Sequence, residues 1–146
     1  MKAYKLFLGM ALAAGSLSFS GCDKESIVSA SDLPSQIQDY VTAHFPNNNI
    51  LQVTKDREGF KHNYELILDE SITLEFNKKH EIVDIDGISK LPDSVVPEKL
   101  LLYISTNFTE NYIIGWEKED KNQEIKLDND MDLVFNMNGD FLKIDD

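Results

Sequence analysis

The most constraining feature of this chain is a pattern that occurs twice. The stretch "LPSQIQDYVTAHFPNNNI" at 33–50 aligns with "VPEKLLLYISTNFTENYI" at 96–113, at an offset of 63 residues. Further along, "ELILDESITLEFNKKHEIVDID" aligns with "EIKLDNDMDLVFNMNGDFLKID" at an offset of 59. Matches that keep one order and need one gap indicate an internal repeat, and a repeat fixes the architecture before any other feature. We therefore expect two copies of one supersecondary unit.

Each copy begins with a predicted helix. Pro34 and Pro97 suit a first helical turn, where a missing N–H is tolerated, and Pro46 ends the first helix. The apolar residues follow helical spacing. They are Leu33, Ile37, Tyr40, Val41 and Phe45 in the first copy, and Val96, Leu100, Tyr103, Ile104 and Phe108 in the second.

Strand-like segments separated by turn residues follow each helix. We place them at 50–55, 60–68, 72–76 and 81–86, then at 112–119, 123–127, 131–135 and 141–145. The connections are short, which favours antiparallel pairing, because parallel strands need long crossovers. The linker between the copies is too short to separate two domains, so we expect their sheets to join edge to edge. The predicted fold is α+β, with two tandem helix-plus-four-strand repeats.

Alternation along the strands predicts two different faces. One face is apolar, should pack against the helices, and contains Tyr64, Leu66, Leu68, Ile72, Leu74, Phe76, Ile125, Leu127, Met131, Leu133 and Phe135. The other face is mixed, and an antiparallel sheet can leave such a face open to water. It contains Glu65, Ile67, Thr73, Glu75, Lys126, Asp132 and Val134. Trp116 has two interpretations, core packing or a partner-binding anchor at the rim of the sheet.

The N-terminal segment reads as a secretory signal over residues 1–21. Lys2 and Lys5 precede an apolar run too short to span a bilayer comfortably, and "FSGC" ends it at Cys22. This ending resembles the lipobox of bacterial lipoproteins, with Phe19 in place of the usual Leu. Cys22 is the one cysteine, so no intramolecular disulfide can form. We take Cys22 as a lipid anchor; the alternative is a plain signal peptide with a stray cysteine.

The domain plan and the charge follow from this reading. Residues 22–32 would be a tether, 33–87 the first repeat and 88–146 the second, forming one domain. Removing residues 1–21 leaves 12 basic against 26 acidic residues, a formal charge of −14. Such a surface repels nucleic acid and anionic lipid, whose recognition needs clustered Lys and Arg. We expect membrane attachment through the lipid on Cys22 alone, in a periplasmic or outer-membrane lipoprotein.

Motifs for metal binding or catalysis are weak. Asp128, Asp130 and Asp132 have the spacing of the first ligands in an EF-hand calcium loop. That loop needs Gly at its sixth position and Glu at its twelfth, where this chain has Leu133 and Gly139. The three histidines, His44, His62 and His80, are too dispersed for a zinc site. The chain has neither a G-x-S-x-G elbow nor a phosphate-binding glycine loop. We expect no metal centre, no cofactor and no enzyme activity; weak cation binding at the acidic turns stays open.

The proline-led helices, and the strands ending in "LEFNKKHEIVDIDG", resemble the PepSY-like, beta-lactamase-inhibitor-like proteins of bacterial envelopes. The resemblance covers about residues 33–146. It implies one curved antiparallel sheet with helices on one side, and it implies little about activity, although related PepSY domains are suspected of restraining peptidases. One departure is His80, which stands where the second copy has the usual turn glycine, Gly139. That departure puts the first turn's conformation in question.

We therefore expect a lipid-anchored, non-catalytic binding module. Its open sheet face would contact another envelope protein, such as a peptidase or other envelope enzyme. The alternative is weak binding of divalent cations or small molecules.

Overall fold

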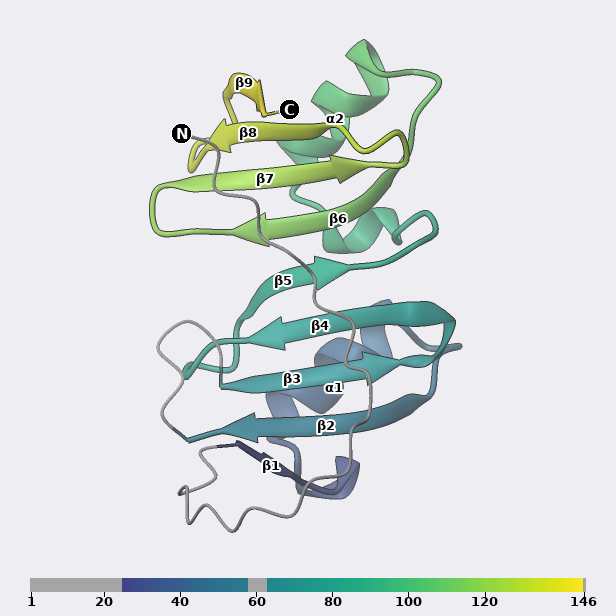
Figure 1. Ribbon diagram of the computed structural model, residues 1–146, viewed down its shortest axis with the longest axis vertical. Coiled ribbons are helices and arrows are strands. Elements are labelled where there is room, and N and C mark those ends of the chain that lie inside the picture. Colours follow the sequence, from purple (N-terminus) through teal and green to yellow (C-terminus); the bar gives the residue numbers. More distant parts are fainter. Residues whose placement is uncertain (1–24, 58–62, 146) are drawn as a thin grey trace, which may run out of the picture.

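The computed structural model describes residues 25–57 and 63–145. They form one antiparallel sheet of nine strands whose spatial order follows the sequence from β1 to β9. Two helices, α1 and α2, lie on the same side of the sheet (Figure 1). The predicted signal segment, the lipidation residue Cys22 and His62 lie outside the described residues.

The elements come in two successive groups, each a helix followed by four strands. The first unit comprises α1 (Ser35–His44), β2 (Ile50–Asp56), β3 (Tyr64–Leu68), β4 (Ile72–Phe76) and β5 (Ile82–Asp86). The second unit comprises α2 (Glu98–Asn107), β6 (Ile113–Lys118), β7 (Asn122–Leu127), β8 (Asp132–Asn136) and β9 (Phe141–Asp145). Three short 3-10 turns are η1 (Ala30–Asp32), η2 (Asp69–Ser71) and η3 (Asp93–Val95). Both helices and all eight strands form within a few residues of their predicted positions.

The two units join edge to edge, as predicted. Strand β5 pairs antiparallel with β6, and Ile85 lies opposite Trp116 in that register. This pairing makes one continuous sheet, because it removes the free edge that each four-stranded unit would otherwise expose.

A ninth strand lies where a tether was expected. Strand β1 (Glu25–Ile27) pairs antiparallel with β2, with Ser26 opposite Lys55. Part of the segment predicted as a tether, Glu25–Ile27, is therefore a strand. Three residues are too few to show an alternating pattern, so this strand could not be predicted from the sequence.

The core lies between the helices and the sheet. Each helix buries residues four apart, Ile37 with Val41 and Leu100 with Ile104. The fully buried strand residues all come from the face predicted to be apolar or continue it. They are Val53, Leu66, Leu68, Leu74, Phe76, Ile85, Ile125, Leu127, Leu133 and Phe135. No helix within the described residues is both long and apolar enough to cross a membrane.

The turns after β4 and β8 have one conformation, despite the His80 substitution. His80 has φ 63° and Gly139 has φ 78°, both in the left-handed region. The backbone N–H of His80 donates to the Asn77 carbonyl at 2.9 Å, and that of Gly139 donates to the Asn136 carbonyl at 2.9 Å. The side chains of both asparagines also accept bonds from turn N–H groups. The departure at His80 therefore leaves the turn intact.

Candidate functional site

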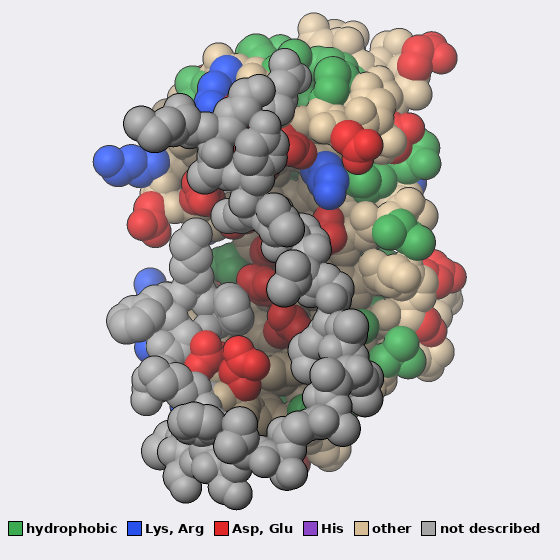
Figure 2. Space-filling view, viewed as in Figure 1, with side chains coloured by type: hydrophobic (Ala, Val, Ile, Leu, Met, Phe, Trp, Pro, Cys, Tyr) green, Lys and Arg blue, Asp and Glu red, His purple; other side chains and the backbone are tan. Residues whose placement is uncertain are grey.

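The open face of the sheet bears a row of five carboxylates on five consecutive strands, which we call the acidic row. Each member lies opposite the next in the strand register. The row consists of Glu65, Glu75, Asp84, Glu117 and Glu124. Figure 2 shows Asp and Glu side chains gathered along the middle of this face. Neighbouring strands lie about 4.8 Å apart, so the row extends about 19 Å across the sheet.

Like charges placed directly opposite one another destabilise a sheet. The strain is clearest at Asp84, in the centre of the row. Burial raises the pKa of this carboxyl to about 7, with further contributions from the charges of Glu75 and Glu117. Burial also raises the pKa of Glu124 and, beside the row, of Asp132. The row is therefore a feature that folding alone does not favour.

A hollow lies beside the row near the turn between β6 and β7. It has a volume of about 800 Å³, and Glu75, Asp84 and Glu117 contribute to its lining. Lys118 and Lys121 also line the hollow, but its acidic residues outnumber them. Elsewhere on this face, Lys126 Nζ lies 4.0 Å from Asp86 Oδ1. This arrangement presents negative charge around a recess, and such a surface attracts cationic groups.

The structure brings together most of the predicted site residues. Six lie half-buried on the open face: Glu65, Ile67, Thr73, Glu75, Lys126 and Asp132. Val134 lies on the same face but is only 5% exposed, so it offers little contact surface. Trp116 does not belong with them. It is 6% exposed, packs in the core on the helix side, and donates its indole N–H to Gln123 Oε1 at 3.3 Å.

Sequence reasoning missed Asp84, Glu117 and Glu124 as members of the site. Glu124 could have been found, because it shares strand parity with Lys126. Asp84 and Glu117 join the row only through the β5–β6 register, which links residues 33 positions apart. No local pattern specifies that register.

The acidic turns have a structural role. Asp128 Oδ1 accepts hydrogen bonds from Asn111 Nδ2 and from the Tyr112 N–H, both at 3.0 Å. Asp69 has the same role in the first unit, where it accepts bonds from Asn48 and Asn49. These bonds lower the pKa of both carboxyls. Each aspartate ties the loop after a helix to the turn between two strands of the same unit.

Metal-ligating groups do not converge in the part of the chain that the structure describes. No group of three or more His, Cys, Asp or Glu side chains is arranged there to hold a metal ion. His44 Nδ1 lies 2.9 Å from Ser94 Oγ, and His80 lies in its turn beside Tyr64, so the two described histidines have separate surroundings.

Fold and surface together define an α+β protein whose single antiparallel sheet has one face covered by helices and one acidic face that the described helices leave open. The sequence profile of the family described as "Putative beta-lactamase-inhibitor-like, PepSY-like" matches residues 21–84 and again residues 62–143. The chain therefore belongs to this PepSY-like family.

Solved structures from Bacteroides share the fold. A "putative calcium-regulated periplasmic protein" from Bacteroides thetaiotaomicron has a TM-score of 0.79 at 23% identity, over 86% of this chain and 100% of its own. A "putative periplasmic protein" from Bacteroides vulgatus has a TM-score of 0.79 at 27% identity, with the same coverage. A second one from B. vulgatus, "of unknown function", has a TM-score of 0.77 at 25% identity, over 84% and 99%. No curated protein matches the chain.

Proposed function

We propose that this protein is a non-catalytic binding module of the cell envelope, which presents its acidic row to a positively charged surface of another envelope protein. The single observation that carries the proposal is the acidic row, because its five carboxylates lie in register on a face that neither described helix covers. Charge complementarity of this kind steers encounter and selects partners. The partner class that we favour is a peptidase or another envelope enzyme, which the bound module would restrain or escort.

The family and its solved relatives support the cellular setting. Two B. vulgatus proteins of this fold, at 27% and 25% identity, are described as periplasmic. We propose the same compartment here, with lipid attachment at Cys22 and a scaffold of two tandem copies of one unit. A Cys22→Ser variant should lose incorporation of labelled fatty acid and leave the membrane fraction, whereas unchanged membrane association would contradict the anchor.

The test of the binding face is crosslinking in cells followed by affinity capture of the lipidated protein. The double variant Glu75→Lys/Glu117→Lys reverses charge in the acidic row, and the matched variant Asp39→Lys/Glu98→Lys reverses charge on the two helices. Capture of a partner should fall at least about tenfold in the first variant and stay unchanged in the second, and it should weaken in high salt. Equal capture by both variants, or no crosslink through the open face, would overturn the proposal.

A second candidate is weak binding of a divalent cation on the open face. The observation that favours it is the position of Asp84 directly opposite both Glu75 and Glu117, because a weakly held cation would offset the repulsion among these like charges. Calcium is the ion to test first, because one solved relative is described as calcium-regulated. Thermal unfolding with and without millimolar calcium is the measurement, and an unchanged midpoint would remove this candidate.

A further inference from the structure

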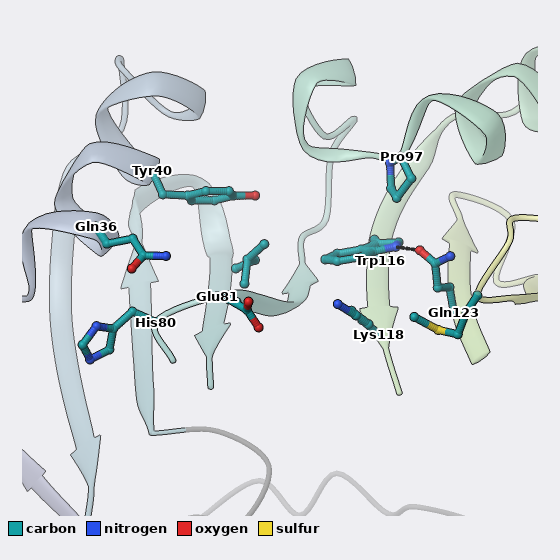
Figure 3. A pocket seen from close by; sticks show the side chains of 10 residues that line it. Gln36, Tyr40, His80, Glu81, Pro97, Trp116, Lys118 and Gln123 are labelled. Atoms are coloured by element: carbon teal, nitrogen blue, oxygen red, sulfur yellow. Dashed lines mark hydrogen bonds between the residues drawn. The ribbon is translucent and has the colours of Figure 1, made fainter. Parts of the chain in front are cut away.

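A groove lies on the helix side of the sheet, where the two units meet. It has a volume of about 540 Å³. Tyr40 of α1 lies on one side of the groove, and Pro97 and Trp116 lie on the other (Figure 3). Ile82 of β5 also lines the groove. Pockets of roughly 300–1,000 Å³ with aromatic walls and a few polar groups are typical of small-molecule sites. This groove is on the opposite side of the sheet from the acidic row.

The second unit shows how the same position can be closed. There, Lys99 Nζ donates to the Asn138 carbonyl at 3.0 Å and bonds the Asp140 carboxylate. The ring of Tyr103 stacks on Phe141, with centroids 5.0 Å apart and planes 13° apart. The helix therefore packs directly onto the β8–β9 turn, and the atoms nearest an added Gly139 Cβ would belong to Lys99 and Leu100.

The first unit has different residues at each of these closing positions. Gln36 replaces Lys99, His80 replaces Gly139, and Ile82 replaces Phe141 at the offsets of 63 and 59 residues. Ile82 gives Tyr40 no ring to stack on, and Gln36 lacks the ammonium group that bonds the turn. Both units have the same backbone arrangement. The groove is therefore open in the first unit because its side chains differ from those of the second.

The hydroxyl of Tyr40 has no hydrogen-bond partner among the described residues although it is buried. Burial raises the pKa of Tyr40, so the hydroxyl stays protonated. Its ring is held against Phe76 at 5.5 Å and His44 at 4.5 Å between centroids, and the hydroxyl points across the groove toward the Trp116 side (Figure 3). A buried polar group without a partner costs about 1–3 kcal/mol. A ligand at the head of the groove can supply that partner.

The wall opposite Tyr40 is held in place by a chain of hydrogen bonds. Trp116 donates to Gln123 Oε1 at 3.3 Å, and Gln123 Nε2 donates to the Asn136 carbonyl at 3.3 Å. Gln123 is itself only 6% exposed. The indole ring is therefore held in place. Although Trp116 is only 6% exposed, it lines the groove, where a ligand ring or aliphatic chain can contact it.

Opposite charges lie at the mouth of the groove. Glu81 accepts a hydrogen bond from Asn77 Nδ2 at 3.0 Å, which is the main cause of its lowered pKa, so it is an anion. Lys118 extends from the other side, and within the described chain no ion pair joins it to Glu81 (Figure 3). The mouth thus offers an anion and a cation to one ligand.

We propose that this groove binds a small zwitterion with an apolar side chain, in the chemical class of the amino acids. The apolar side chain would lie between Tyr40 and Trp116, the ammonium group would face Glu81, and the carboxylate would face Lys118. This site is independent of the binding function proposed for the acidic row.

L-Phenylalanine is the probe, and the emission of Trp116 is the readout, because the chain has one tryptophan. Isothermal titration calorimetry gives the affinity independently. We expect saturable binding, with phenethylamine and 3-phenylpropionate at least about tenfold weaker, since each lacks one of the two charges. Failure of phenylalanine to bind would overturn the proposal. If either singly charged analogue bound as tightly as phenylalanine, the assignment of the ligand as a zwitterion would be wrong.

Variants that copy the second unit locate the site. Ile82→Phe should fill the groove and abolish binding. Gln36→Lys should place an ammonium group beside Glu81 and weaken binding at least about tenfold. This second variant tests the site even if Ile82→Phe fails to fold. Leu51→Phe, at an exposed position on β2 outside the groove, is the matched control and should bind normally. Binding that persists in both Ile82→Phe and Gln36→Lys would overturn the assignment of the binding site to this groove.

Tyr40→Phe separates a ligand-binding role from a packing role. It should weaken phenylalanine binding several-fold while leaving thermal stability equal or higher, because the buried hydroxyl lacks a partner within the described chain. Tyr103→Phe is the matched control in the second unit. Unchanged binding in Tyr40→Phe would contradict the placement of the ligand at the head of the groove.

Discussion

Asp84 has two carboxylates as its direct neighbours, Glu75 on β4 and Glu117 on β6. Burial and these charges favour its protonated form in the folded state, with a pKa of about 7 against an ordinary value of 3.8. A group whose pKa rises on folding contributes stability fully below its unfolded pKa. That contribution is lost as the pH rises through the folded pKa. Ionisation of Asp84 therefore lowers the stability of the folded protein at neutral pH.

Replacing Asp84 with Asn should relieve this cost in a pH-dependent way. We expect Asp84→Asn to raise the free energy of unfolding by about 2 kcal/mol at pH 8 and by less than about 1 kcal/mol at pH 5. Urea unfolding at the two pH values measures the difference. Asp39→Asn, on the exposed side of α1, is the matched control. An equal gain at both pH values would contradict the assignment.

The opposite sign applies to Asp128, whose hydrogen bonds to Asn111 and Tyr112 lower its pKa. Its contribution is present above the ordinary carboxyl pKa of 3.8 and is lost as the pH falls through the folded value. Asp128→Ala should therefore lower the melting temperature at pH 7, and the difference from the parent should shrink at pH 3. Asp120→Ala, in the β6–β7 turn, is the control. A deficit that stays constant down to pH 3 would rule out the carboxylate as its source.

At the scale of elements, the two units place identical turns under different helices. The turn between β8 and β9 lies close under α2, because an added Cβ at Gly139 would lie 3.0 Å from Lys99 Cδ and 3.1 Å from Leu100 Cδ1. The turn between β4 and β5 already accommodates the Cβ of His80 at a similar positive φ. The spacing between helix and turn is thus tight in one unit and relaxed in the other.

Alanine at these two equivalent turn positions should have unequal effects. Gly139→Ala should destabilise the fold by about 1–3 kcal/mol, since it adds both left-handed strain and a close contact. His80→Ala should change stability by less than about 1 kcal/mol, because a Cβ is already present there. Chemical denaturation of both variants is the measurement. Similar losses would show that α2 can move away from its turn without cost.

At the scale of the whole molecule, negative charge is both in excess and concentrated. The full chain has a formal net charge of −12, and five of its carboxylates form the acidic row on one face. Such a distribution strains the compact state through self-repulsion, and salt screens exposed charges over about 10 Å at 0.1 M. Part of the destabilisation caused by the acidic row should therefore decrease as the ionic strength rises.

Raising sodium chloride from about 0.05 M to about 0.5 M at pH 8 should raise the melting temperature by about 3 °C or more. The double variant Asp84→Asn/Glu117→Gln should show a smaller response, because two members of the row are neutral. The double variant Asp39→Asn/Glu98→Gln removes the same charge from the helices and should keep the parental response. Equal responses in the two double variants would show that net charge, and not the row, sets the salt dependence.

The sequence by itself determined the elements and their faces. Helical spacing located α1 and α2, and alternation assigned the strand residues to a buried or an open face, because both signals depend on the local backbone period. It did not reveal β1, which is too short to carry a pattern, and it left Trp116 between two interpretations that tertiary packing resolved in favour of the core. Only the tertiary structure decided the site. Asp84 meets Glu117 through the β5–β6 register, and Tyr40 faces Trp116 across the two units, so both features depend on long-range contacts that no local period encodes.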